Sequence, residues 1–117
     1  MTSPESYFTY LTGRSWKGRL YREHCLYPKI ARHLEGEVLD VGCGIGDMLA
    51  FLDNATGVDI NPHTVSYCKS RGLNALMMHI DVLPFPDASF DSVLLDNVLE
   101  HLIAPQPLLA EIHRVLR

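Results

Sequence analysis

Residues 38–59 read VLDVGCGIGDMLAFLDNATGVD, and this stretch decides the fold class. A short apolar run leads into Asp40 and then into a loop with glycine at every second position from 42 to 46. A helical pattern follows over 47–53, and a second apolar run ends at Asp59. A strand, a glycine loop, a helix, a second strand and an acid, in this order, are typical of a nucleotide-type cofactor site in an α/β domain.

The glycine loop and Asp59 each have a ligand-binding interpretation and a purely structural one. Glycine allows the backbone to turn sharply and to lie against a ligand. Asp59 comes 17 residues after Gly42, the first glycine of the loop, and ends the second strand, where a carboxylate accepts hydrogen bonds from both hydroxyls of a ribose. The structural alternatives are a tight turn for the glycines and a strand-end turn for Asp59. Because both features occur in one stretch, we favour contact with a cofactor.

The loop does not suit a dinucleotide. The third glycine of a G-x-G-x-x-G fingerprint would stand at position 47, where the chain has Asp47. Asp40 and Asp47 flank the loop with negative charge. A pyrophosphate bound there would place like charges at close range, which costs about 4 kcal/mol at an effective dielectric of 20. These acids favour a ligand that is cationic near the loop. The sequence has no Gly-Lys-Ser or Gly-Lys-Thr run, which excludes a P-loop.

Four segments together resemble class I S-adenosylmethionine-dependent methyltransferases. The loop from Asp40 to Gly46 resembles their motif I, and their cofactor carries a sulfonium and an ammonium group. GVDIN at 57–61 resembles their ribose-binding acid segment. HIDVLPFPDASFDSVLLDNVLEHL at 79–102 is similar to the third and fourth motifs of the small-molecule, methyltransferase type 11-like branch. The resemblance covers residues 36–117.

The resemblance implies a fold and a cofactor site. The fold is α/β, a Rossmann-like three-layer sandwich with a mostly parallel sheet in the strand order 3-2-1-4. The expected cofactor is S-adenosylmethionine, with S-adenosylhomocysteine as the product. Asp81 would meet the adenine amino group, with an Asx turn before Pro84 as the alternative. The residues expected to contact the cofactor are Asp40, Gly42, Cys43, Gly44, Gly46, Asp59, Ile60, Asp81, Val82, Asp96 and Asn97.

A Glu100-His101 pair resembles the Glu-His pair that follows strand four in this family. His101 is the candidate general base that deprotonates the acceptor. A hydrogen-bonded structural histidine is the alternative. Metal-dependent RNA-end methyltransferases have Glu-x-x-Glu-His at this point, whereas this chain has Asn97 in place of the first carboxylate. We therefore expect no metal site.

Periodicity and turn residues predict the remaining elements. Ser3 and Pro4 open a short first helix, and Gly13 and Gly18 precede a longer one over about 20–34. The continuous apolar run at 90–95 predicts a strand that is buried on both faces. The other predicted elements are strands at 38–41, 56–60 and 75–78, a helix from Asn61-Pro62 to Gly72 and a helix from about Pro107. We divide the chain into an N-terminal helical segment, 1–35, and an incomplete cofactor-binding core, 36–117.

The family sheet has seven strands, and we expect three of them to be missing from this sequence. The strand at 90–95 would then be a long apolar edge, which promotes association. We expect either a homodimer through this edge or another chain that covers it.

Bulk properties limit the remaining functions. A chain of 117 residues with a net charge of −4 predicts one domain and no nucleic-acid partner. Basic residues are concentrated at 14–32. They form either a solvated helix face or a patch that faces an anionic substrate or a membrane surface. Three cysteines without C-x-x-C spacing predict a reduced, cytoplasmic protein without zinc. The longest apolar run, 48–52, is too short for membrane insertion.

These features favour a methyltransferase that transfers the sulfonium methyl to a small-molecule, lipid or glycan-precursor acceptor. The reaction is an in-line displacement, so the protein mainly positions two reactants and excludes water. Two alternatives remain. One is a non-catalytic S-adenosylmethionine-binding module, or a fragment that needs a partner to complete the sheet. The other is an NAD-type oxidoreductase, disfavoured by Asp47 and the missing glycine.

Overall fold

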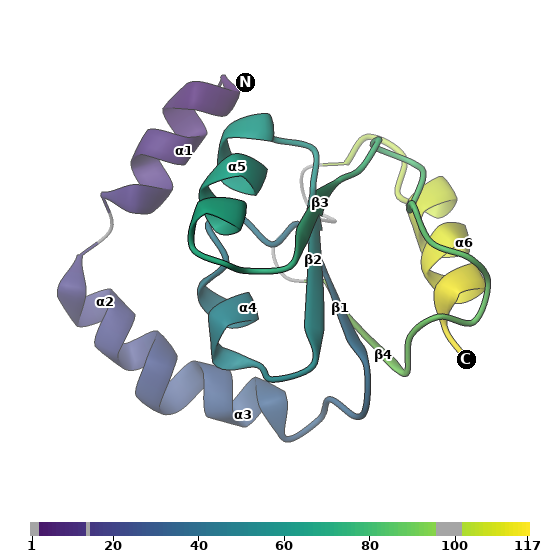
Figure 1. Cartoon of the computed structure of the whole chain (residues 1–117), viewed down its shortest axis with the longest axis horizontal. Helices are drawn as coiled ribbons and strands as arrows, with labels where there is room; N and C mark the ends of the chain where they lie inside the picture. Colours follow the sequence, from purple (N-terminus) through teal and green to yellow (C-terminus); the bar gives the residue numbers. More distant parts are fainter. Residues whose placement is uncertain (1–2, 14, 96–101) are drawn as a thin grey trace.

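The computed structural model describes residues 3–13, 15–95 and 102–117. A four-stranded sheet lies between two layers of helices (Figure 1). Among these residues, five helices and a π-helical turn lie on one side of the sheet, and one helix lies on the other. The helical elements are α1 (Pro4–Thr12), α2 (Trp16–Tyr21), η1 (Arg22–Leu26), α3 (Tyr27–Ala31), α4 (Asp47–Phe51), α5 (Pro62–Ser70) and α6 (Gln106–Val115).

The strands run parallel in the order β3-β2-β1-β4, as predicted. They are β1 (Val38–Val41), β2 (Ala55–Asp59), β3 (Ala75–Met77) and β4 (Ser92–Leu95). Leu39 of β1 faces Thr56 of β2 on one side and Val93 of β4 on the other. The α/β, Rossmann-like fold class is therefore confirmed, and the carboxyl ends of β1 and β2 meet at one edge of the sheet.

Two apolar clusters hold the layers together. The larger cluster joins the sheet to α6, with Leu39, Leu108 and Val115 almost completely buried. The smaller cluster joins the sheet to α4 and α5 and includes Leu49 and Cys68. A buried leucine contributes roughly 1.5–3 kcal/mol relative to an exposed one, so both helix layers are firmly attached.

The N-terminal helices differ in part from their prediction. The Ser3 side chain caps α1, as expected. The second helical run begins at Trp16 and continues through Gly18, because Ser15 accepts a hydrogen bond from the Gly18 N–H and caps the helix. A π turn interrupts this run just before Pro28, which has no N–H to continue the α-helical pattern.

Strand β4 is shorter and less buried than predicted. It begins at Ser92, because Phe90 pairs instead with the chain that follows α6, donating to the Val115 carbonyl and accepting from the Arg117 N–H. Its four residues are half-buried. Within the described residues β4 pairs only with β1, so it forms an edge of the sheet. The prediction of burial on both faces is therefore wrong, and the edge is short rather than long.

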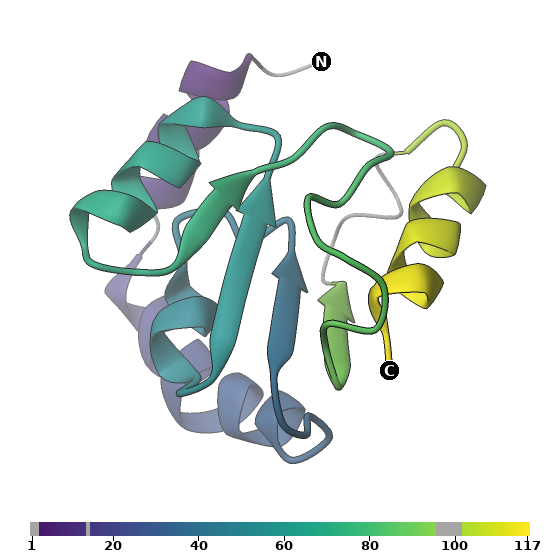
Figure 2. The ribbon, with the colours of Figure 1, turned by 45° about the vertical axis from the view of Figure 1, so that its right-hand side comes forward.

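The loop between β3 and β4 runs between the sheet and α6 (Figure 2). Leu83 and Phe90 of this loop belong to the larger apolar cluster. Phe85 packs edge-on against Phe90, with ring centroids 4.9 Å apart. These contacts hold in place a loop that contains no named helix or strand. The first residues of the loop lie along the carboxyl edge of the sheet.

Candidate functional site

The glycine loop turns back over the end of β2. Gly42, Gly44 and Gly46 have φ values of 77°, 57° and 86°, in the left-handed region that favours glycine. The N–H groups of Gly42 and Cys43 both donate to the Val58 carbonyl, at 2.8 and 3.1 Å. The loop therefore needs its glycines for their backbone conformation, and β2 holds it in place.

Asp59 braces this loop. One carboxylate oxygen accepts from the Gly44 N–H and the other from the Asn61 N–H, both at 2.9 Å. The side chain is 8% exposed. Burial raises the pKa of Asp59, and the hydrogen bonds from Asn61 and Gly44 oppose this rise. An ionised carboxylate has about four acceptor sites, more than these backbone N–H groups occupy, so Asp59 can still accept from a ligand.

Sequence reasoning missed this bracing role. The two partners of Asp59 lie 15 residues before it and 2 residues after it. Asn61 carried a local signal, since its side chain caps α5 by accepting from the His63 N–H. The bond to Gly44 had no local signal, because it depends on the side-by-side position of β1 and β2.

Asp40 and Cys43 are buried near the base of the loop. Asp40 is 4% exposed and lies opposite Gly57 in the β1–β2 register. A Cβ on Gly57 would lie 2.8 Å from the Cys43 sulfur, so only glycine fits there. A hydrogen bond with the Cys68 thiol, together with burial, raises the pKa of the Cys43 thiol. Cys43 is therefore a packing residue of the loop rather than a reactive thiol.

The segment expected to meet adenine lies at the same edge of the sheet. The Met78 N–H donates to the Asp59 carbonyl at 3.1 Å, which places the chain after β3 beside the end of β2. His79 and Val82 then pair across a tight turn that exposes Asp81. Ile60 and Val82 are 53% and 52% exposed. The fold thus brings two exposed apolar side chains and two carboxylates to one edge.

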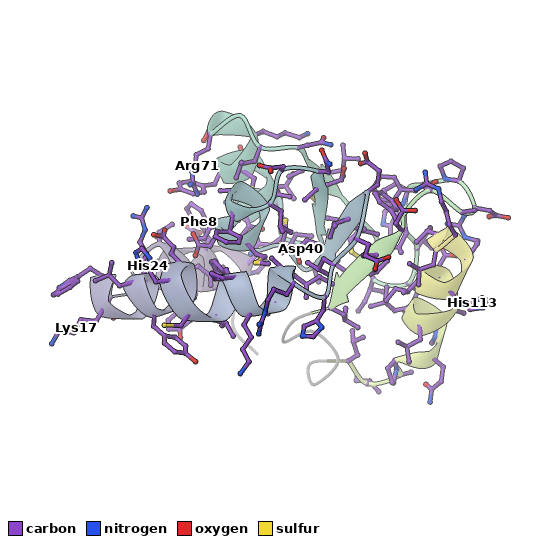
Figure 3. The ribbon with its side chains drawn as sticks, turned by 90° about the horizontal axis from the view of Figure 1, so that it is seen from below. Phe8, Lys17, His24, Asp40, Arg71 and His113 are labelled. Carbon is purple, nitrogen blue, oxygen red and sulfur yellow. The ribbon has the colours of Figure 1, made fainter. Side chains whose placement is uncertain are left out.

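Helix α1 covers the outer side of the glycine loop. Leu11 is buried, and its Cδ1 lies 3.4 Å from where a Cβ on Gly44 would be. The Asn61 side chain donates to the Pro4 carbonyl at 2.8 Å. Phe8 packs edge-on against Tyr67 of α5, on the side of the sheet that also carries Arg71 (Figure 3). Sequence reasoning gave this helix no part in the site.

Four residues named from the sequence lie outside the described part of the chain: Asp96, Asn97, Glu100 and His101. Their roles stay predictions. Over residues 3–13, 15–95 and 102–117, no group of three or more His, Cys, Asp or Glu side chains is arranged to hold a metal ion. In the same ranges no helix has both the length and the apolar character needed to cross a membrane.

Comparison with known proteins identifies the family. A family model described as a methyltransferase domain matches residues 39–117. A fatty-acid O-methyltransferase of Mycolicibacterium smegmatis is 37% identical over 97 residues, 72% of this chain and 35% of the relative. A probable S-adenosylmethionine-dependent methyltransferase of the same organism is 34% identical over 103 residues, 82% of this chain and 40% of the relative.

A solved structure supports the same fold. A Thermotoga maritima protein, described as an S-adenosylmethionine-dependent methyltransferase and possible histamine N-methyltransferase, superposes with a TM-score of 0.81 at 23% identity. The match covers 94% of this chain and 54% of that protein. The chain spans 35–43% of the length of the first curated relatives it matches. It belongs to the class I S-adenosylmethionine-dependent methyltransferase family.

Proposed function

We propose that this chain forms the cofactor-binding part of a methyltransferase and binds S-adenosylmethionine through the carboxyl edge of β1 and β2. The observation that carries the proposal is the carboxylate of Asp59, held between the Gly44 and Asn61 N–H groups at the end of β2. This places a buried acceptor beside a glycine loop, the arrangement suited to a ribose next to a close-lying backbone. Residues 36–117 would form this core, with 1–35 as its cover.

The chemistry of the edge fits each part of the cofactor. The exposed apolar side chains of Ile60 and Val82 would lie against the adenine ring, and Asp81 would accept from its amino group. Asp40 is an acidic residue buried near the glycine loop, and a carboxylate there would favour a ligand with sulfonium and ammonium groups over a pyrophosphate. By resemblance, Asp96 and Asn97 would hold the methionine part.

When bound, the cofactor supplies a methyl group already activated by its sulfonium. The chain's own residues then have three tasks: to bind the ribose, to orient the adenine and to keep water out. Leu11 and α1 would contribute to the third task, since they cover the outer side of the loop. By resemblance, His101 would accept the proton of the acceptor.

For the acceptor we propose an apolar small molecule or lipid that carries a hydroxyl or carboxyl group. The name of one relative, a fatty-acid O-methyltransferase, supports this class. A glycan precursor is the other acceptor class compatible with the family resemblance. The three free cysteines, Cys25, Cys43 and Cys68, support work in a reducing compartment such as the cytoplasm.

A second function is a binding module that holds the cofactor without turnover or needs a partner to complete its sheet. The observation that favours it is the half-buried edge strand β4, which pairs only with β1 among the described residues. In this case the cofactor site is intact, but methyl transfer requires the partner.

Titration calorimetry of the 117-residue chain tests the ligand class. We expect saturable binding of S-adenosylhomocysteine and none of NAD. Binding of NAD alone, or of neither ligand, would overturn the proposed function. Release of S-adenosylhomocysteine from S-adenosylmethionine in the presence of a long-chain fatty acid then separates the enzyme from the module. Binding without release under any acceptor class would favour the module.

A further inference from the structure

An ion pair on α6 holds the loop that leads from β3 to β4. Both backbone polar groups of Leu83 bind to it. The Leu83 N–H donates to Glu111 Oε1 at 2.9 Å, and the Leu83 carbonyl accepts from Arg114 Nη2 at 3.1 Å. Arg114 Nη1 also donates to the Phe85 carbonyl at 2.8 Å and to Asp87 Oδ1 at 2.9 Å. A single guanidinium therefore binds three points of the loop.

Glu111 and Arg114 bind each other through two hydrogen bonds. Arg114 Nε donates to Glu111 Oε2 at 2.6 Å and Nη2 donates to Oε1 at 3.1 Å, the two-pronged contact that guanidinium and carboxylate favour. Hydrogen bonds from Arg114 and from the Leu83 N–H lower the pKa of Glu111, so the carboxylate stays ionised at neutral pH. The Leu83 side chain is buried in the same apolar cluster as Leu108 of α6.

The Glu111–Arg114 pair holds the loop directly after the segment that the proposed function assigns to adenine. Leu83 directly follows Asp81 and Val82, the two residues assigned to adenine in the proposed function. On the other side of them, Met78 is tied to β2 through the Asp59 carbonyl. The adenine segment is thus a short exposed turn between two fixed points, one on β2 and one on α6.

We propose that Arg114 and Glu111 are positioning residues for adenine recognition. They fix Leu83 and thereby the place at which Asp81 meets the amino group of the purine. A site that hydrogen-bonds one group discriminates strongly against an analogue that lacks it, but only while its acceptor stays in place. The inference rests on the proposed function, because it assumes that Asp81 faces the adenine.

The test compares two ligands that differ only at C6 and N1 of the purine. S-adenosylhomocysteine carries an amino group at C6 and an acceptor nitrogen at N1, and S-inosylhomocysteine has an oxo group at C6 and an N–H at N1. The ratio of their two dissociation constants measures adenine recognition separately from total affinity. We expect a ratio of about 10 or more in the unmodified chain and a fall of about 3–10-fold in Arg114→Gln.

Two further variants make the result specific. Arg114→Lys keeps the positive charge but cannot make the same set of contacts, so its ratio should also fall. Lysine is also the milder change if Arg114→Gln does not fold. Arg117→Gln is the matched control, because Arg117 follows α6 and pairs with Asp91 at 2.9 Å but does not hold Leu83. Its ratio should equal that of the unmodified chain.

The outcomes separate a positioning role from a structural one. General loss of stability would weaken both ligands equally and leave the ratio unchanged. An unchanged ratio in Arg114→Lys, with S-adenosylhomocysteine still bound, would overturn the inference and leave the proposed function intact. Failure of the unmodified chain to bind S-adenosylhomocysteine would overturn both.

Discussion

Replacing Asp59 by alanine removes the acceptor of two backbone N–H groups at once, those of Gly44 and Asn61. Hydrogen bonds to a charged group contribute about 1.5–3 kcal/mol each. Burial raises the pKa of Asp59, so the carboxylate also carries a desolvation cost that alanine relieves. The two bonds together give about 3–6 kcal/mol, and the relieved desolvation cost lowers this sum, so we expect the free energy of unfolding to fall by about 2–3 kcal/mol.

The same substitution removes the proposed ribose acceptor. A loss of about 1.5–3 kcal/mol in binding corresponds to a rise of about 10–150-fold in the dissociation constant for S-adenosylhomocysteine. Urea unfolding measures the first effect, and calorimetry measures the second at a temperature where the variant is still folded. The free energy of unfolding reports how Asp59 stabilises the loop, and the dissociation constant reports its contact with the ligand.

Asp53→Ala is the matched control, because Asp53 is an exposed acid in the turn between α4 and β2. It should change neither quantity. An unchanged dissociation constant in Asp59→Ala would remove the central residue of the proposed site. An unchanged free energy of unfolding would instead refute the argument that Asp59 holds the glycine loop.

Three further predictions follow from the same geometry. Gly44→Val and Gly72→Val both place a branched side chain at positive φ, so urea unfolding should show that both variants lose stability. Calorimetry should show lost cofactor binding only for Gly44→Val, because a Cβ on Gly72 meets nothing within 4 Å. Full binding by Gly44→Val would contradict this prediction. Because the ionised carboxylate is the proposed ribose acceptor and burial raises the pKa of Asp59, affinity should fall on acidification at a higher pH than for an ordinary aspartate, and a calorimetric pH series without such a fall would speak against this role. The edge of β4 should make the chain associate, so light scattering should show an average mass that rises with concentration, whereas a constant monomer mass would exclude pairing through this edge.

Local sequence signals predicted most of the helices and strands and the turn of the glycine loop. Alternate glycines from 42 to 46 predicted the turn, and all three adopt positive φ. Ser3 and Asn61 predicted two helix starts, and both side chains cap their helices. Such signals succeed because they act over a few residues, where a missing Cβ or one side-chain hydrogen bond decides the backbone conformation.

Predictions that depended on a residue's neighbours in space were less successful. The apolar run at 90–95 predicted a strand buried on both faces, but Phe90 leaves the sheet to pair beside Val115, and the remaining strand is half-buried at an edge. Burial of a strand depends on what covers it, and the run itself carries no information about its cover.

The sequence by itself determined the α/β class, the glycine turn, the strand-end acid and, through the family motifs, the family and the strand order. Only the tertiary structure decided that Asp59 holds Gly44, that Leu11 covers the loop and that Arg114 clamps Leu83 from 31 residues away. The physical reason is the range of the interactions. Backbone conformation responds to adjacent residues, whereas these hydrogen bonds and contacts form only after parallel strands and α6 have packed side by side.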